Sequence, residues 1–388
     1  MRRNVLLASC LALALGTAGC QEQKAAPTAP DAELRSESTT ALRFKLEQAR
    51  LKLPSSARIS DRYFADVVRR AIDPTEHVCD PLTPLVTWLF GEIDEIPPAI
   101  LNGIIFPLAA DQIPFVDALF FQTEDTPQFF GYNGEYTRIM LKTERDVKRF
   151  WDIFSDDIQL IGMHGTMLLD VDRVAASYEA GFVDENGDPI SHDDAVLFAT
   201  LVANAVQQTP ALNGGNHALF SFNAFAISAP GFIPDKVVMG DGILEGYEAL
   251  GFGDVAPQGV YGHEFAHHIQ YENGYFDEIP PGATTVAELT RYTELMADAM
   301  SAYYLTHKRG GAMNRKRVEQ FLQAFFQIGD CSFTSSGHHG TPNQRMRAAR
   351  FGFDLADQAQ KQGHILTSDQ VHDAFVVAYP SLVAPDAT

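Results

Sequence analysis

The chain has 388 residues, a formal net charge of −21 and a sequence pI of about 4.9, and 46% of its residues are hydrophobic. A chain of this length and composition can bury a sizeable core in one large or two ordinary domains. The acidic balance argues against nucleic acid as a partner, because phosphate binding requires clustered Lys and Arg.

Residues 1–19 are typical of a secretory signal. Arg2 and Arg3 precede an almost wholly apolar run over residues 5–15, which is too short to span a bilayer as a helix. Small residues then lead to Cys20. We therefore predict that residues 1–19 are removed and do not belong to the fold.

The sequence TAGC at 17–20 resembles the cleavage site of bacterial lipoproteins, in which the Cys becomes lipid-modified, although Thr17 replaces the usual Leu. We predict a lipidated Cys20, a polar tether over residues 20–34 and attachment to a lipid bilayer. By resemblance to lipoprotein sorting, Gln21 favours the outer membrane, facing the periplasm. The alternative is an ordinary signal peptide with a chance Cys and a soluble periplasmic or secreted protein.

Two cysteines remain once Cys10 leaves with the signal and Cys20 is acylated. Cys79 and Cys331 form an even pair in an oxidising compartment. We predict a disulfide between them; the alternative is two buried free thiols.

Residues 35–230 are predicted to form a mixed, mainly helical region packed on a catalytic core at 231–388. Helical signals occur at 38–53 and 144–153, and residues 136–141 alternate between apolar and polar as in a strand.

Asn186-Gly187 lies between short apolar flanks and predicts a hairpin over residues 182–190. The acidic run 184–188 lacks the length and terminal Glu of an EF-hand, so a solvated turn is favoured over a calcium site.

From Lys236 onward the sequence signals for helices and strands are clearer. Residues 236–240 predict a short strand, and the helix that follows ends at Asn273-Gly274. Thr285 opens a second helix, which runs to about Lys308. Two further helices are predicted, one over 315–328 and one that begins at Thr341-Pro342.

The most informative motif is HEFAH at 263–267. Residues i and i+4 share one face of a helix, so His263 and His267 can reach a single ion, with Glu264 beside them to hold a water. A catalytic zinc needs a third protein ligand and an open position for water.

Glu294 and Asp298 share one face of the next predicted helix. We predict that Glu294 is the third zinc ligand. Asp298 would accept a hydrogen bond from the outer nitrogen of one of the His ligands and orient it. The alternative is a solvated acidic face, but the flanking residues are apolar.

Three motifs together, HEFAHHIQ at 263–270, ELMAD at 294–298 and HGTPNQR at 339–345, resemble the neutral zinc metallopeptidases of bacteria, a gluzincin-type family. The similarity covers residues 236–353. It implies an α+β, mainly helical fold with a zincin-like core, in which a small sheet lies beside the HExxH helix. It also implies one Zn²⁺ ion and hydrolysis of a peptide or protein substrate.

Under this interpretation Glu264 acts as general base on a zinc-bound water. The strand at 237–239 could pair with an extended substrate. His339 ranks first as the stabiliser of the oxyanion, since a later His or Arg does this work in related gluzincins. The other candidates are Arg345, Tyr303 and Tyr304.

Three further histidines are not predicted to bind the metal. His268 is interpreted as a packing or ligand-supporting residue, and His164 and His217 are left out of the site because neither has ligand spacing to a partner.

Two other functions stay open: a zinc amidase acting on cell-wall peptides, and a non-catalytic envelope scaffold or chaperone that keeps zinc for stability. The presence of Glu264 argues against the scaffold, because a structural site needs no general base.

Overall fold

A computed structural model of the chain describes residues 58–59, 83–184, 186–280, 283–327 and 340–384. Several predicted features lie outside these residues and are not described further: the signal and tether of residues 1–34, the helix at 38–53, Cys20, the Cys79–Cys331 disulfide and His339.

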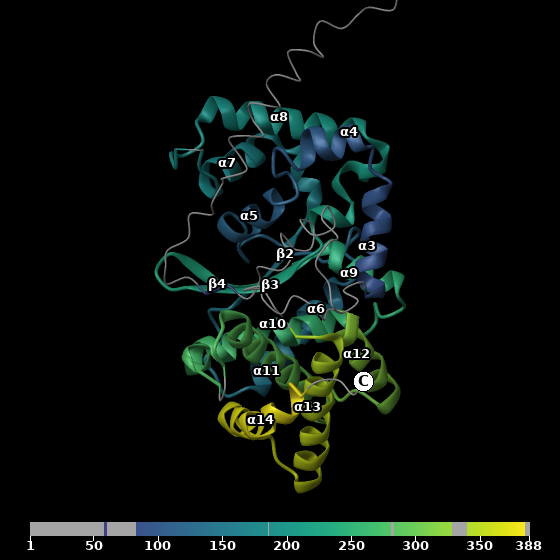
Figure 1. The fold of residues 1–388 in the computed structure, drawn as a ribbon, viewed down its shortest axis with the longest axis vertical. Helices are drawn as coiled ribbons and strands as arrows, with labels where there is room; N and C mark the ends of the chain where they lie inside the picture. Colours follow the sequence, from purple (N-terminus) through teal and green to yellow (C-terminus); the bar gives the residue numbers. More distant parts are fainter. Residues whose placement is uncertain (1–57, 60–82, 185, 281–282, 328–339, 385–388) are drawn as a thin grey trace, which may run out of the picture.

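A small sheet crosses the middle of the molecule, and helices cover it above and below (Figure 1). The strands lie in the order β1-β3-β4-β2. Their bounds are β1 Arg58–Ile59, β2 Gln159–Met163, β3 Ala224–Ala229 and β4 Ile233–Gly240. The described chain is otherwise mainly helical, so the predicted mainly helical α+β class is confirmed.

Strand β4 is the centre of the sheet. It pairs antiparallel with β3 and parallel with β2, so backbone partners lie on both of its sides. The prediction that residues 237–239 pair with an extended substrate is therefore wrong, because a strand with two neighbours has no open edge to offer.

The two faces of the sheet bury different side chains. Alternate residues point to opposite faces of a strand, which separates two hydrophobic clusters. The face that contacts α5 (Ile113–Phe120) carries a small cluster that includes Ile161, Phe225 and Val238. Side chains of the opposite face, such as Val237, join the main core that includes the metal-motif helix α10 (Ala256–Asn273).

Strand β2 forms one edge of the sheet, and side chains cover it. Glu124 Oε1 accepts a hydrogen bond from Leu160 N at 2.7 Å, and Gln128 Oε1 accepts one from Gly162 N at 3.0 Å. These two oxygens take the places that the carbonyls of a further strand would occupy.

The helices before α10 surround the sheet, most of them above it in Figure 1 and one of them, α6, below it against α10. Their bounds are α3 Pro84–Asp94, α4 Pro98–Ile100, α5 Ile113–Phe120, α6 Thr137–Phe150, α7 Val171–Gly181, α8 His192–Gln208 and α9 Asp241–Ala249. The shorter turns are η1 Leu101–Ile105, η2 Gly165–Leu169, η3 Pro210–Gly215 and η4 Ala218–Phe220.

The strand predicted at 136–141 is wrong, because these residues open helix α6. Met140, Thr143, Val147 and Phe150 are its buried residues. Their spacing of three and four follows the helix period, and this longer pattern outweighs the short alternation before it. The turn predicted at 182–190 is present and is closed by a single bridge between Val183 and Pro189.

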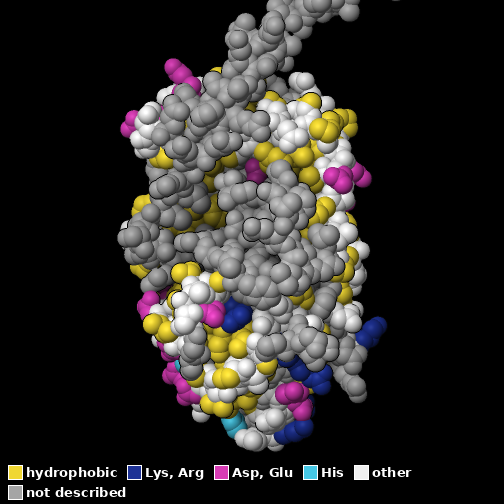
Figure 2. All heavy atoms as spheres, viewed as in Figure 1, with side chains coloured by type: hydrophobic (Ala, Val, Ile, Leu, Met, Phe, Trp, Pro, Cys, Tyr) yellow, Lys and Arg dark blue, Asp and Glu magenta, His cyan; other side chains and the backbone are white. Residues whose placement is uncertain are grey.

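From α10 onward the described residues add five helices and a short turn to the lower part of the molecule: α10, η5 (Tyr275–Asp277), α11 (Val286–Thr306), α12 (Arg315–Gln327), α13 (Pro342–Gln362) and α14 (Ser368–Leu382). The predicted stop of α10 is confirmed, with Gly274 in the left-handed conformation at φ 75°. The capping boxes at Thr285 and Thr341 are also confirmed. On the face shown in Figure 2, the visible Lys and Arg side chains lie over this lower part.

Two glycines allow the helices around the motif to approach closely. A Cβ atom at Gly352 of α13 would lie 2.0 Å from Ala299 O of α11, and one at Gly262 of α10 would lie 2.8 Å from Ser301 Oγ. Larger residues at these two positions would push α11 away from its neighbours.

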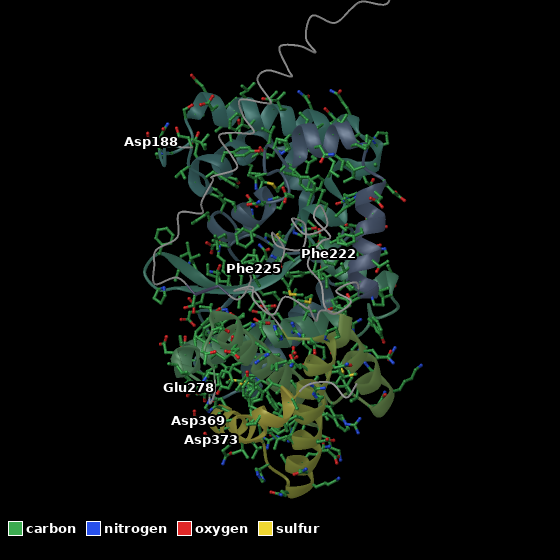
Figure 3. All side chains as sticks on the ribbon, in the orientation of Figure 1. Asp188, Phe222, Phe225, Glu278, Asp369 and Asp373 are labelled. Carbon is green, nitrogen blue, oxygen red and sulfur yellow. The ribbon has the colours of Figure 1, made fainter. Side chains whose placement is uncertain are left out.

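The segment after α10 returns to α14. Tyr275 donates a hydrogen bond to Asp369, and His372 Nε2 lies 2.8 Å from Glu278 Oε2. Figure 3 shows Glu278 and Asp369 close together at this end of the molecule.

The main hydrophobic cluster extends from Leu85 to Leu382. The β3–β4 hairpin crosses the predicted boundary at residue 230, which itself stays a prediction. Among the helices of the described residues, none combines the length and apolar character needed to cross a membrane.

Candidate metal centre

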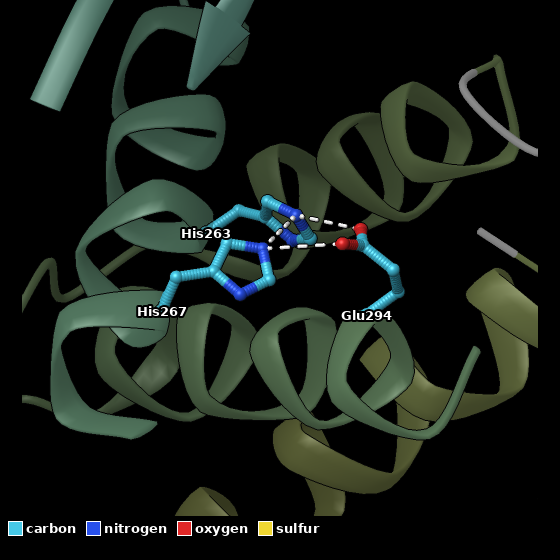
Figure 4. A group of neighbouring side chains, drawn as sticks. All are labelled: His263, His267 and Glu294. Atoms are coloured by element: carbon cyan, nitrogen blue, oxygen red, sulfur yellow. Dashed lines mark hydrogen bonds and ion pairs between the residues drawn. The ribbon is translucent and has the colours of Figure 1, made fainter. Parts of the chain in front are cut away.

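The two histidines of the motif project from one face of α10 toward α11, which supplies Glu294 (Figure 4). All three side chains are buried: His263 is 4% exposed, His267 0% and Glu294 2%. Their ligand atoms lie within 4.8 Å of one another. The structure therefore brings together the three residues predicted as metal ligands.

The spacing of these atoms fits a small tetrahedral ion. His263 Nε2 lies 3.2 Å from His267 Nε2 and 3.2 Å from Glu294 Oε2, while His267 Nε2 lies 3.4 Å from Glu294 Oε1. Zinc binds nitrogen and oxygen at about 2.0–2.1 Å, so ligand atoms at the corners of a regular tetrahedron lie about 3.3 Å apart. The three atoms are therefore spaced as three corners of a tetrahedron of this size, and the group could hold a metal ion.

His263 is oriented from behind by Asp298. Its Nδ1 lies 2.9 Å from Asp298 Oδ1, the contact expected from the sequence. Because a carboxylate accepts this hydrogen bond, Nδ1 carries the proton and Nε2 presents its lone pair to the ion.

His267 is oriented by a different chain of bonds. Its Nδ1 donates to Gln270 Oε1 at 3.0 Å, and Gln270 Nε2 donates to Thr293 O at 2.7 Å. Since Thr293 O only accepts, the amide of Gln270 must present its oxygen to the imidazole. The proton of His267 is therefore also on Nδ1, which leaves Nε2 for the metal.

Arg345 of α13 completes the cluster. It binds Asp298 as a fork, with Nε 2.9 Å from Oδ2 and Nη2 2.6 Å from Oδ1, and its Nη1 lies 3.7 Å from Glu294 Oε2. Asp298 therefore accepts hydrogen bonds from both His263 and Arg345, and three helices are joined at one carboxylate.

The charges of this buried cluster favour a divalent cation. Glu264, Glu294 and Asp298 supply three negative charges and Arg345 one positive charge, and each of the four is at most 6% exposed. A buried net charge of −2 is costly when it is uncompensated, and one divalent ion would balance it.

The same field acts on His263 in the metal-free chain. Burial opposes the charged imidazole and lowers its pKa, but the hydrogen bonds to Asp298 and Glu294 outweigh burial and raise the pKa to about 10. The position between the carboxylates thus stabilises positive charge, whether a proton or a metal ion carries it.

Glu264 is 6% exposed and lies close enough to His263 for its charge to raise the pKa of that ring. Its charge is thus held beside the three candidate ligands and away from bulk water.

The other predicted residues have different surroundings. His268 Nε2 lies 2.9 Å from Lys236 O, so His268 links the motif helix to β4. Tyr303 OH accepts a hydrogen bond from Leu366 N. His339 lies outside the described residues; the next residue, Gly340, lies against Leu295 and Arg291 of α11.

Two supporting residues received no such role from the sequence. Gln270 follows His267 by three positions on the same helix face, a spacing that could have revealed it. Arg345 was predicted only as a possible oxyanion stabiliser, yet its guanidinium fork is engaged by Asp298. No local pattern connects positions 298 and 345, so that partnership could not be read from spacing.

Comparisons with family models, with curated proteins and with solved structures found no match for this chain. Function therefore has to be argued from the geometry and chemistry of the site.

Proposed function

We propose that this chain is a zinc-dependent metalloendopeptidase in which His263, His267 and Glu294 hold one zinc ion. The observation that carries the proposal is the triangle of ligand atoms, whose sides of 3.2, 3.2 and 3.4 Å match the edges of a zinc tetrahedron. We further assign α10 and the sheet above it to a zincin-like core.

A zinc ion bound here would supply Lewis acidity, lowering the pKa of water and polarising a carbonyl group. Three protein ligands are the set found in catalytic zinc sites, which keep a fourth position open. The carboxylate of Glu264 accepts the proton of the attacking water and delivers it to the nitrogen of the leaving amine. Asp298 and Gln270 keep the two imidazoles in the tautomer that this work requires.

The test combines metal analysis with a cleavage assay on the purified full-length protein. We expect one zinc per chain, cleavage of an unfolded protein such as reduced casein, and loss of cleavage on treatment with a chelator. Glu264→Gln should keep the zinc and lower the rate by roughly a hundred- to ten-thousand-fold, the usual contribution of a general base.

Glu272→Gln is the matched control, since Glu272 is an exposed glutamate on the same helix. It should leave both metal content and rate unchanged. A Glu264→Gln variant as active as the parent would contradict the mechanism, and a protein that purifies without zinc and does not bind added zinc would contradict the site.

The remaining outcomes separate the alternatives. Zinc-dependent cleavage of cell-wall peptides, with none of casein, would favour the amidase, and a zinc-bound protein that cleaves neither would favour the scaffold. Location in the cell envelope through Cys20 is part of the same proposal. Incorporation of labelled fatty acid into the parent, with none into Cys20→Ser, tests it.

A further inference from the structure

A second histidine–aspartate pair lies far from the metal motif in the sequence. His164 Nδ1 is 2.7 Å from Asp241 Oδ2. His164 directly follows β2 and Asp241 directly follows β4, and these strands are parallel, with Met163 paired to Gly240. Both residues thus lie at the carboxyl ends of adjacent parallel strands, the position at which parallel α/β sheets bind ligands, although the other strand pairs of this sheet are antiparallel.

The aspartate of this pair is fixed and buried. Asp241 is 2% exposed, and its other oxygen accepts a hydrogen bond from Gly131 N at 2.8 Å. Its carboxylate therefore holds the proton of the His164 ring on Nδ1. Within the described residues, Nε2 of His164 makes no hydrogen bond, so this nitrogen remains for a ligand.

The ring of His164 is also held by its neighbours. The Phe129 ring stacks on it, with centroids 3.8 Å apart and planes 5° from parallel. The other contact is with Gly162, where a Cβ atom would lie 2.7 Å from Nε2, so only glycine allows the ring this position. The imidazole is therefore fixed in place before any ligand binds.

His164 lines a cavity of about 340 Å³, within the size range of small-molecule sites. Phe129, Met167 and Leu169 give the cavity an apolar wall. Phe129 and Leu169 are 42% and 43% exposed, which is high for side chains of this size.

Arg173 supplies a hydrogen-bond donor at the same cavity, and Asp117 balances its charge. Asp117 binds Nε at 2.8 Å and Nη2 at 2.5 Å, which fixes the guanidinium. Its Nη1 makes no hydrogen bond within the described residues. Asp170 also lines the cavity, but its carboxylate accepts a hydrogen bond from Arg173 N at the start of α7.

We propose that this cavity binds a small organic carboxylate with an apolar body, independently of the metal centre. The carboxylate contacts Arg173 Nη1 and His164 Nε2, and since Asp241 holds the first ring proton on Nδ1, Nε2 takes up a second proton as the ligand binds. The apolar body lies against Phe129 and Leu169. Arg173 Nη1 can donate a hydrogen bond but cannot ligate a metal ion, no group of three metal ligands includes His164 within the described residues, and the apolar wall disfavours a bare inorganic anion.

Calorimetry with phenylacetate as the probe tests this proposal on the full-length protein. Phenylethanol has the ring without the charge, and acetate has the charge without the apolar body. We expect phenylacetate to bind at millimolar or lower concentration, and each of the two fragments at least tenfold more weakly. Phenylacetate should bind equally well with a chelator present and to His263→Ala, so failure here is distinguishable from failure of the zinc site.

His164→Gln and Arg173→Lys should each weaken phenylacetate binding at least tenfold. Arg173→Lys keeps a cation beside Asp117, and a melting curve like that of the parent will show that the fold is retained. His192→Gln is the matched control, because His192 also lies beside a carboxylate, 2.6 Å from Glu179, but is 76% exposed and lines no described cavity.

Arg350→Lys is the control for the arginine, since Arg350 is 64% exposed and lies 3.7 Å from Asp354. Both controls should bind phenylacetate as the parent does. The proposal is overturned if phenylacetate does not bind, if phenylethanol or acetate binds as well, or if folded His164→Gln and Arg173→Lys bind it like the parent.

Discussion

His263 and His164 each direct Nδ1 at a buried aspartate, at 2.9 Å from Asp298 and 2.7 Å from Asp241, yet the two rings face different surroundings. Opposite Nε2 of His263 lie a second imidazole and a carboxylate, and the three groups together could hold a metal ion. His164 instead stands in the wall of a cavity with an arginine, and no such group of metal ligands surrounds it within the described residues.

The difference shows that a His–Asp pair specifies orientation and tautomer but not chemistry. What decides the chemistry is the set of groups that the fold places opposite the second nitrogen. At His263 that set comes from two helices in contact, and at His164 it comes from a turn and the first residues of α7.

The largest expected effect is on zinc content, and it should follow from a substitution in the metal centre but not from one beside the His164 cavity. Glu294→Ala should abolish stoichiometric zinc, because two imidazoles alone form an incomplete site. Asp241→Asn should leave zinc at one per chain. Metal analysis after gel filtration measures both, and a Glu294→Ala protein that keeps its zinc would break the distinction between the two regions.

Substitution of Arg345 tests whether the balance of buried charge at the metal centre contributes to the stability of the protein. Arg345→Met leaves Asp298 without its guanidinium, so we expect the metal-free protein to lose about 3–5 kcal/mol of unfolding free energy. The matched control is Arg350→Met on the same helix, which removes an exposed pair and should cost under about 1 kcal/mol. Urea unfolding in a chelator compares the two, and equal losses would contradict the prediction.

Asp111 is a third buried aspartate to compare with Asp298 and Asp241. Unlike them, it has neither an imidazole nor a guanidinium bound to it within the described residues. Burial raises its pKa to about 7. The native state then holds a proton that the unfolded state has already released, so the contribution of Asp111 to stability falls as pH rises from about 4 to about 7 and is level above.

The loss across that window is at most about 4 kcal/mol, which corresponds to roughly three pKa units. Asp111→Asn should remove it, so the variant should exceed the parent in stability near pH 8 and approach it near pH 4. Unfolding curves across this range are the measurement. Asp354→Asn, at an exposed residue, should not change the slope, and an Asp111→Asn variant with the slope of the parent would contradict the assignment.

The smallest expected effect is on zinc affinity and concerns His267, the second of the two proposed histidine ligands. Gln270→Leu removes the acceptor that orients His267, so we expect zinc affinity to fall about 10- to 100-fold. Gln258→Leu changes a glutamine of the same helix whose amide bonds instead to Asp254 O, and should have no effect. Competition with a chromogenic chelator measures both affinities, and equal values would show that Gln270 does not orient the ligand.

Local signals predicted the lower part of the molecule well. The end of α10 at Gly274 and the capping boxes at Thr285 and Thr341 each depend on a few adjacent residues. The spacing of His263, His267 and Glu294 could be derived because two helix faces suffice to define it.

Long-range pairings could not be read in the same way. The parallel contact of β2 with β4, which brings His164 to Asp241, joins positions 77 residues apart. His164 was set aside because sequence spacing offered it no partner, and the fork between Asp298 and Arg345 joins positions 47 apart. Helix and turn signals do not encode such contacts, since tertiary packing creates them.

The covered edge of β2 has a consequence for the behaviour of the protein in concentrated solution. Open amides on an edge strand recruit the edge of another molecule and start aggregation. Glu124 and Gln128 occupy those amides, and the glutamate also adds charge at the margin of the sheet. Two side chains of one loop therefore help to keep copies of this chain apart from one another.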